Sequence, residues 1–248
     1  MGSRDLIRRR AQEHDVVLSG EPTALEEVIV LGTSGVAGLS VRMASSGLGL
    51  SQDSRPIEEL ADMMLRTREV SAQVPETRMN WTLAKADDTR RLDRMPSPNM
   101  TATFRVQGKA SHAGVNPHLG INALIETADL IQRVGAQVYP IPDLTWHWRS
   151  WHGGIVPNII PNESTLVLEL SIGTQADRVQ ILKTIASAAE KTWLAGAKVQ
   201  VDFKEGPFQS SDSSSTVFAS ADMRVPDAQA YDRLALRVRD LLDAKNLR

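Results

Sequence analysis

The segment from Gly108 to Gly114, which reads GKASHAG, places a histidine between two predicted elements. Alternation of apolar residues predicts a strand over residues 100–106, and a helix is predicted to open after Gly120. At such a junction, free backbone N–H groups and a flexible glycine let a side chain face a ligand instead of the core. Imidazole can donate a hydrogen bond near neutral pH, so His112 is a candidate catalytic residue; the alternative is a capping or surface histidine.

A second glycine-rich segment, residues 153–161, follows and reads GGIVPNIIP. Its Asn158 carries an amide that can donate to a carboxylate and accept from an amine. The alternative role for this residue is that of a turn asparagine. Gly154, next to Gly153, allows a close approach of the backbone.

These two segments, in this order, resemble the lid, or dimerisation, domain of a family of zinc-dependent peptidases and aminoacylases. The family includes glutamate carboxypeptidase, acetylornithine deacetylase, succinyl-diaminopimelate desuccinylase and dipeptidase V. The resemblance implies that His112 stabilises the oxyanion of the tetrahedral intermediate, and that Asn158 and Gly154 contact the substrate. Arg224, at the end of a predicted strand, matches the family arginine that binds the substrate's free carboxylate, a task suited to a guanidinium. Strand-end arginines are also commonly surface residues.

The resemblance also implies two zinc ions in a separate catalytic domain, with a metal-bound water as nucleophile and a glutamate as general base. Glu21, in the SGEPT segment, matches one zinc ligand, but the family's other ligands have no counterpart in matching context. We therefore expect a fragment that binds no zinc by itself and is inactive without its own catalytic domain. Three further histidines, His118, His147 and His152, are not brought together by strand alternation, so surface or core roles are predicted for them.

The elements that must position these residues form two similar series. The second series is complete and reads βαββαβ, with strands at residues 100–106, 144–148, 164–172 and 198–203 and helices at 123–131 and 179–189. The first series is split around it. Before it come a strand pair or one long interrupted strand over 28–42, a helix over 57–65 and a strand over 79–86; after it and a serine-rich linker come a strand over 217–223 and a helix over 231–242.

The simplest account is an internal duplication, in which an intact unit at 97–208 is inserted into a degenerate unit formed by 25–96 and 212–248. Residues 1–24 are interpreted as a remnant of the catalytic domain. The predicted class is α+β, with two ferredoxin-like plait units, antiparallel sheets and helices on one face. The resemblance to dipeptidase V implies that a doubled lid imitates a dimer, so we expect a monomer, or otherwise a homodimer.

The degenerate unit differs from the intact unit where chemistry is expected. Ser46 stands where the intact unit has His112, and Asp93 lies near the expected asparagine. Conversely, the intact unit has Ser171 at the position of Arg224. A complete site would therefore draw the histidine from one unit and the arginine from the other.

Composition limits the other possibilities. The 248 residues are 42% hydrophobic and 23% charged, which is typical of a globular protein, and a net charge of −2 provides no field for binding nucleic acid or anionic lipid. The absence of cysteine excludes disulfides and thiolate zinc sites, and with no run of about 18 apolar residues we predict a cytoplasmic protein. The predicted substrate is a small amide or peptide with a free carboxylate. The alternative function is a stand-alone dimerisation or protein-interaction module without catalysis.

Overall fold

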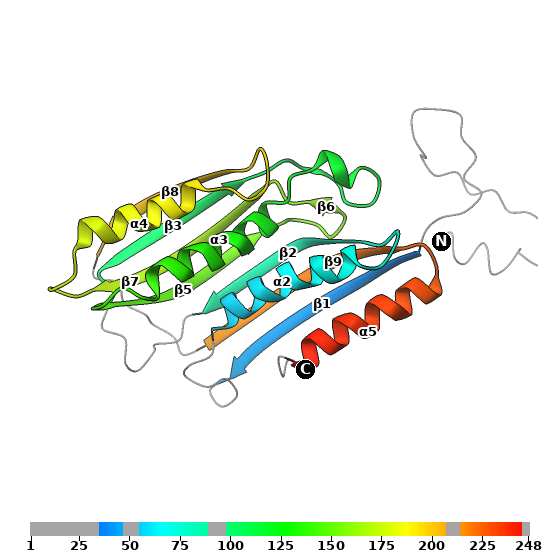
Figure 1. The fold of residues 1–248 in the computed structure, drawn as a ribbon, viewed down its shortest axis with the longest axis horizontal. Helices are drawn as coiled ribbons and strands as arrows, with labels where there is room; N and C mark the ends of the chain where they lie inside the picture. The colour runs from blue at the N-terminus through cyan, green and yellow to red at the C-terminus, as the bar shows by residue number, and fades with distance from the viewer. Residues whose placement is uncertain (1–34, 47–54, 89–97, 207–213, 245–248) are drawn as a thin grey trace, which may run out of the picture. The chain divides into compact units, whose positions relative to one another are not determined.

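The computed structural model describes residues 35–46, 55–88, 98–206 and 214–244, which form an antiparallel sheet with helices packed on it (Figure 1). The predicted α+β class is confirmed. In chain order the elements are β1 (Gly35–Ser46), α2 (Pro56–Ala72), β2 (Arg78–Asp88), β3 (Met100–Gln107), β4 (Ser111–His112), the 3-10 helix η1 (Pro117–Leu119), α3 (Ala123–Val138), β5 (Leu144–Gly153), β6 (Ile159–Ile160), β7 (Glu163–Ile172), α4 (Arg178–Glu190), β8 (Lys198–Glu205), β9 (Ser214–Val225) and α5 (Ala228–Ala244).

Seven of the strands form one sheet in the order β1-β9-β2-β5-β7-β3-β8. Strands β3, β5, β7 and β8, with helices α3 and α4, make up the βαββαβ series. Strand β9 follows that whole series in the chain, yet it lies between β1 and β2 (Figure 1). This strand order is compatible with a nested arrangement, while descent by duplication and the limits of the two units stay predictions.

The core lies between the sheet and the helices. Along β3, Met100, Ala102, Phe104 and Val106 are buried while the side chains between them are less buried, as period-two alternation requires. Helix α3 supplies the facing apolar stripe and begins at Asn122, whose Oδ1 accepts hydrogen bonds from the backbone N–H groups of the second and third helical residues at 3.0 and 3.3 Å. The sequence therefore sets both the start of this helix and the face that it buries.

The two groups of strands meet at a seam between β2 and β5, where the pairing runs from Ala84↔Gly153 to Asp87↔Ser150. Helices α2 and α3 lie side by side over this seam (Figure 1). Each seam strand buries a tryptophan whose ring N–H is satisfied: Trp81 donates to Thr67 at 3.0 Å, and Trp151 donates to Ser164 at 2.9 Å. The seam is thus part of one continuous sheet and core.

Three details differ from the sequence prediction. His112, predicted in a loop, lies in the two-residue strand β4, which is too short to leave an alternation pattern. Strand β9 begins at Ser214, inside the stretch predicted as a linker, because its first residues are serines without an apolar pattern. The strand predicted within 28–42 is described only from Gly35, and it continues to Ser46.

Candidate functional site

The ring of His112 is held in one orientation by its own loop. Strand β4 pairs with β6, which places His112 opposite Ile159. The backbone N–H groups of Gly114 and Val115 both donate to Nδ1 of the imidazole, each at 3.1 Å. Because Nδ1 accepts these two bonds, the neutral ring carries its proton on Nε2. The side chain is exposed, so His112 can present Nε2–H as a donor to a ligand.

Asn158 lies beside this loop. Its backbone carbonyl accepts a hydrogen bond from the N–H of Ala113 at 2.9 Å, and its side chain is exposed. The structure therefore brings the two glycine-rich segments of the sequence together. A role for the Asn158 amide in binding a substrate stays a prediction.

Arg224 reaches the same loop from β9. A Cβ placed on Gly114 would lie only 2.6 Å from Nη2 of Arg224, so the guanidinium packs directly against the glycine backbone. On the neighbouring strand β2, Arg78 is the cross-strand partner of Arg224. Arg224 from β9 thus packs against the loop between β3 and α3 that carries His112.

Two further polar residues lie near the histidine loop, and the sequence analysis did not identify them. Asn80 on β2 donates from its amide to the carbonyl of Ala113, at 3.4 Å, and Asp222 on β9 is its cross-strand partner. Burial raises the pKa of Asp222, and the nearby ring of His112 opposes that rise when it is protonated. Asp222 could have been found, because alternation along β9 places it on the same face as Arg224.

A bulge in β2 anchors the loops that carry the histidine and the asparagine. The register of β2 against β9 shifts between Trp81 and Leu83. Asn122 donates from Nδ2 to the Trp81 carbonyl at 2.8 Å. Gly154 has φ of +78°, and a Cβ there would lie 1.8 Å from the Thr82 carbonyl oxygen. Packing against β2 is sufficient to explain the glycine at 154. Contact of Gly154 with the substrate stays a prediction.

The three histidines for which surface or core roles were predicted do not form a metal cluster in the part of the chain described here. Within it, no group of three or more His, Asp or Glu side chains could hold a metal ion. His118 lies in η1, buried His147 has Nε2 3.0 Å from the Asp88 carbonyl oxygen, and exposed His152 has Nε2 3.0 Å from Oδ1 of Asp87. Glu21 and Asp93 lie outside the described residues, as does the side chain of Ser46. The two-zinc site that the resemblance implies in a separate catalytic domain, with Glu21 as one ligand, thus stays a prediction.

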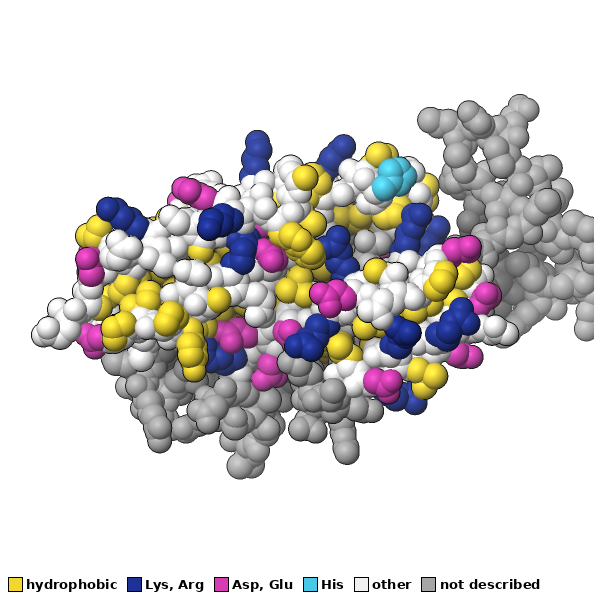
Figure 2. Space-filling model, in the orientation of Figure 1, with side chains coloured by type: hydrophobic (Ala, Val, Ile, Leu, Met, Phe, Trp, Pro, Cys, Tyr) yellow, Lys and Arg dark blue, Asp and Glu magenta, His cyan; other side chains and the backbone are white. Residues whose placement is uncertain are grey.

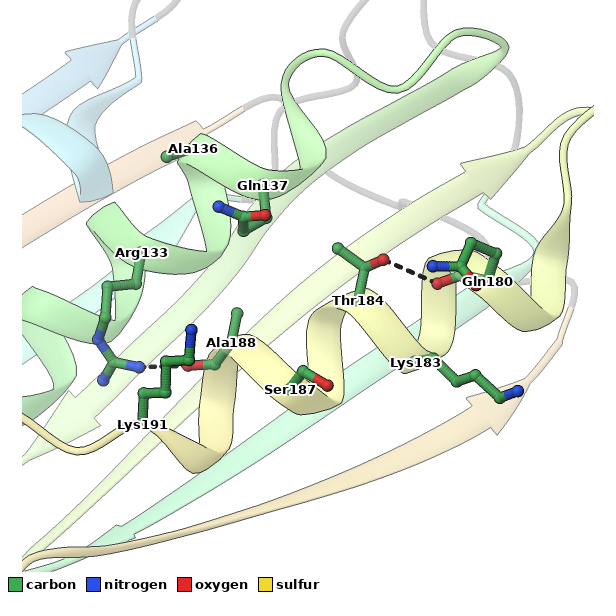
Figure 3. A pocket seen from close by; sticks show the side chains of 9 residues that line it. All are labelled: Arg133, Ala136, Gln137, Gln180, Lys183, Thr184, Ser187, Ala188 and Lys191. Atoms are coloured by element: carbon green, nitrogen blue, oxygen red, sulfur yellow. Dashed lines mark hydrogen bonds between the residues drawn. The ribbon is translucent and has the colours of Figure 1, made fainter.

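A cavity of about 500 Å³ lies between α3 and α4 (Figure 3). Its lining includes Lys183, Lys191 and Arg133. The Arg133 guanidinium is already engaged by Glu126, Asp129 and the Ala188 carbonyl, so it serves helix packing. None of the lining residues belongs to the loops that carry His112 and Asn158.

Comparison with known proteins identifies the βαββαβ part of the chain. Residues 98–197 match the family model described as a peptidase dimerisation domain. This segment is a peptidase dimerisation domain. The dimerisation domain contains His112 and Asn158, whereas Arg224 lies outside the matched residues. The family resemblance predicted from the sequence is confirmed.

One relative is carboxypeptidase G2 of Pseudomonas sp. (strain RS-16), which is 28% identical over 206 residues. The match covers 83% of this chain and 34% of the carboxypeptidase, so the chain spans about a third of the length of this curated relative. Solved structures similar to this chain include aminopeptidase PepT from Bacillus cereus, with a TM-score of 0.36 and 17% sequence identity over 54% of this chain and 34% of that one. Another is the aminobenzoyl-glutamate utilization protein from Klebsiella pneumoniae, with a TM-score of 0.35 and 19% sequence identity over 48% of this chain and 33% of that one. None of the helices in the described ranges is long and apolar enough to cross a membrane.

Proposed function

We propose that this chain is the lid of a peptidase or amidohydrolase that acts on a small amide or peptide with a free carboxylate. The observation that carries the proposal is the packing of Arg224 on Gly114, two residues from His112. A donor for a developing oxyanion and a guanidinium for a carboxylate then lie within reach of one small substrate.

His112 is assigned to transition-state stabilisation. Its Nδ1 is fixed by two backbone N–H groups, so Nε2–H is oriented before the substrate arrives. A donor that is already oriented stabilises a developing negative charge without the cost of reorganisation. Asn80 stabilises the histidine loop by donating a hydrogen bond to the Ala113 carbonyl.

Arg224 is assigned to the substrate carboxylate, with Asn158 and Gly154 as further substrate contacts. The planar guanidinium can donate two parallel hydrogen bonds to a carboxylate. Because Arg224 comes from β9 and His112 from the dimerisation domain, a substrate bound to both would bridge the two groups of strands.

The residues that the structure describes include no group of three or more side chains that could hold a metal ion. Peptidases of this family generally depend on a metal, and the two zinc ions and the ligand Glu21 stay predictions that require a catalytic domain. Attack on the amide is therefore assigned to that domain. This chain is assigned the binding and orientation of the substrate and the stabilisation of the transition state. The seam of β2 and β5 inside one chain supports a monomeric lid.

The test uses the enzyme formed by this chain together with its catalytic domain. His112→Ala is expected to lower kcat by about 10² to 10³, the usual effect of removing an oxyanion donor, with an unchanged melting temperature. His118→Ala is the matched control, because His118 is also exposed and lies in the same β3–α3 connection. Unchanged turnover in His112→Ala would refute the role given to this residue.

A further inference from the structure

The groove between α3 and α4 carries positive charge that the proposed function does not use. Its volume of about 500 Å³ lies within the range of small-molecule sites. None of the described residues that line it is an aspartate or a glutamate, whereas Lys183 and Lys191 both line it. The charge of Arg133 is offset by Glu126 and Asp129, while neither lysine forms an ion pair with another described residue. Figure 2 shows Lys and Arg side chains over α4 on this face of the molecule. The two lysines therefore leave the groove with a net positive charge.

The lysines stand at opposite ends of the groove. They are eight residues apart along α4, with Lys191 at its C-cap, so the rise of a helix separates their Cα atoms by about 12 Å. In Figure 3 the two ammonium groups lie on either side of the stretch of α4 that carries Thr184 and Ser187. Both lysines are exposed, and the four-carbon stem of each is flexible. Each ammonium group can therefore move towards an anion bound at its own end of the groove.

Polar side chains between the lysines have unused hydrogen-bonding capacity. The amides of Gln137 and Gln180 and the hydroxyl of Ser187 make no hydrogen bond to another residue that the structure describes. The Thr184 hydroxyl donates to the Gln180 carbonyl at 2.9 Å, so its oxygen can still accept. Among the described lining residues, only two alanines lack a polar side chain. The middle of the groove thus suits a ligand with hydroxyl groups better than an apolar one.

We propose that the α3–α4 groove binds an elongated small molecule with a phosphate group at each end and hydroxyl groups between them. A phosphate monoester carries a charge of about −1.5 to −2 at neutral pH and has several acceptor oxygens, which suits an ammonium point charge. A planar carboxylate is matched better by a guanidinium, and the guanidinium of Arg133 is already engaged. No lining residue belongs to the loops of His112 and Asn158, so this site does not depend on the proposed function.

The test compares fructose 1,6-bisphosphate with fructose 6-phosphate on the 248-residue chain by NMR titration. Both sugars carry hydroxyl groups and one phosphate, and they differ by the second phosphate. We expect the bisphosphate to bind about ten-fold more tightly, with amide shifts on α3 and α4. Lys183→Gln and Lys191→Gln are each expected to abolish this preference, because a single ammonium group then remains. Both side chains are exposed, so the melting temperature is expected to stay unchanged.

Control variants separate this site from a general attraction of anions. Lys198→Gln and Lys204→Gln remove exposed lysines of β8 and are expected to leave the preference at about ten-fold. Lys191→Arg keeps the charge and is expected to keep most of the preference. If the β8 variants lower the preference as much as Lys183→Gln does, the binding is non-specific and the proposed site is wrong. Equal affinity for the two sugars, or shifts that fall outside α3 and α4, would also overturn it.

A dicarboxylate tests the phosphate class. Suberate has an anionic group at each end, but it has one charge per group and no hydroxyl groups. We expect it to bind at least about ten-fold more weakly than fructose 1,6-bisphosphate. Equal affinity for the two compounds would show that the groove does not select phosphate, and the proposal would fail.

Discussion

The guanidinium of Arg224 occupies the space that a side chain at position 114 would fill. Nη2, Cζ and Nε of the arginine lie 2.6, 2.9 and 2.9 Å from the position of a Cβ on Gly114. Gly114 lies two residues after His112, whose ring accepts a hydrogen bond from the Gly114 N–H. The glycine thus makes room for the arginine and at the same time fixes the histidine, which links the two residues assigned to the substrate.

Gly114→Ala is therefore expected to displace the Arg224 side chain while leaving the fold intact. The alanine methyl group meets the flexible end of a side chain, so we expect a change in unfolding free energy within about 0.5 kcal/mol. Loss of the guanidinium from its place is expected to weaken N-acetylglycine binding about ten-fold, measured by NMR titration.

Gly38→Ala is the matched control for that variant, because a Cβ at Gly38 on β1 has nothing within 4 Å. This variant is expected to bind N-acetylglycine as the unchanged chain does. Equal affinity in Gly114→Ala and Gly38→Ala would contradict a role for the Arg224 position in binding.

The sequence singled out two segments that adjoin in the structure, but it did not indicate which residues of other strands contact them. The GKASHAG and GGIVPNIIP segments pointed to His112 and Asn158, which the structure places on adjoining loops. Asn80 was missed because its contact with the histidine loop joins β2 to a segment more than thirty residues away in the chain. Long-range strand pairing leaves no local signal in a sequence, so contacts of this kind emerge only from the folded structure.

Gly154→Ala is expected to destabilise the chain strongly. The residue has φ of +78°, and its Cβ would meet backbone atoms of Thr82 and Leu83 on β2, which cannot move aside as a side chain can. We expect a loss of about 2 to 4 kcal/mol in the free energy of unfolding, measured by urea denaturation. By contrast, Gly135→Ala in α3 meets only Trp146 at 3.8 Å, and we expect a gain of about 0.5 to 1 kcal/mol from helix propensity. A tolerated alanine at 154 would show that the contact with the β2 bulge is not needed.

The titration of Asp222 gives stability a pH dependence of known sign. Burial raises the pKa of Asp222 in the folded chain above its unfolded value. Its contribution to stability is then complete below the unfolded pKa and is lost as the pH rises through the folded pKa. Asp222→Asn is accordingly expected to be more stable than the unchanged chain at neutral pH, with the difference disappearing towards about pH 3. Urea denaturation at several pH values measures this, and an Asn variant that is less stable at neutral pH would contradict it.

A second arm of this experiment uses the histidine. The positive charge of His112 lowers the pKa of Asp222 against the effect of burial. His112→Ala is therefore expected to raise the pKa of Asp222 further, which a carboxyl-carbon NMR titration can follow. No change would show that the two side chains do not interact.

The fold was predictable from the sequence where an element has a local periodic pattern of apolar residues. The apolar alternation of residues 100–106 and the helical spacing of 123–131 predicted β3 and α3, although α3 extends to Val138. The β4–β6 ribbon was not predictable, since each strand has two residues and its pairing is non-local. The pairing of β2 with β5 was also not predictable, because it joins residues more than sixty positions apart in the chain and neither strand records its partner.

The seam leads to a prediction about assembly. Pairing of β2 with β5, together with packing of α2 beside α3, covers within one chain one edge of each of these strands and the facing sides of the two helices. We expect the 248-residue chain to sediment as a monomer of 27.2 kDa over the micromolar range. A dimer would instead favour the stand-alone dimerisation module. Asp222→Asn and Ile155→Ser, whose positions are not among the residues paired between β2 and β5, are expected to leave the sedimentation coefficient unchanged. Because β2 and β5 already pair with each other, neither strand has a free edge at the seam with which a second copy could pair.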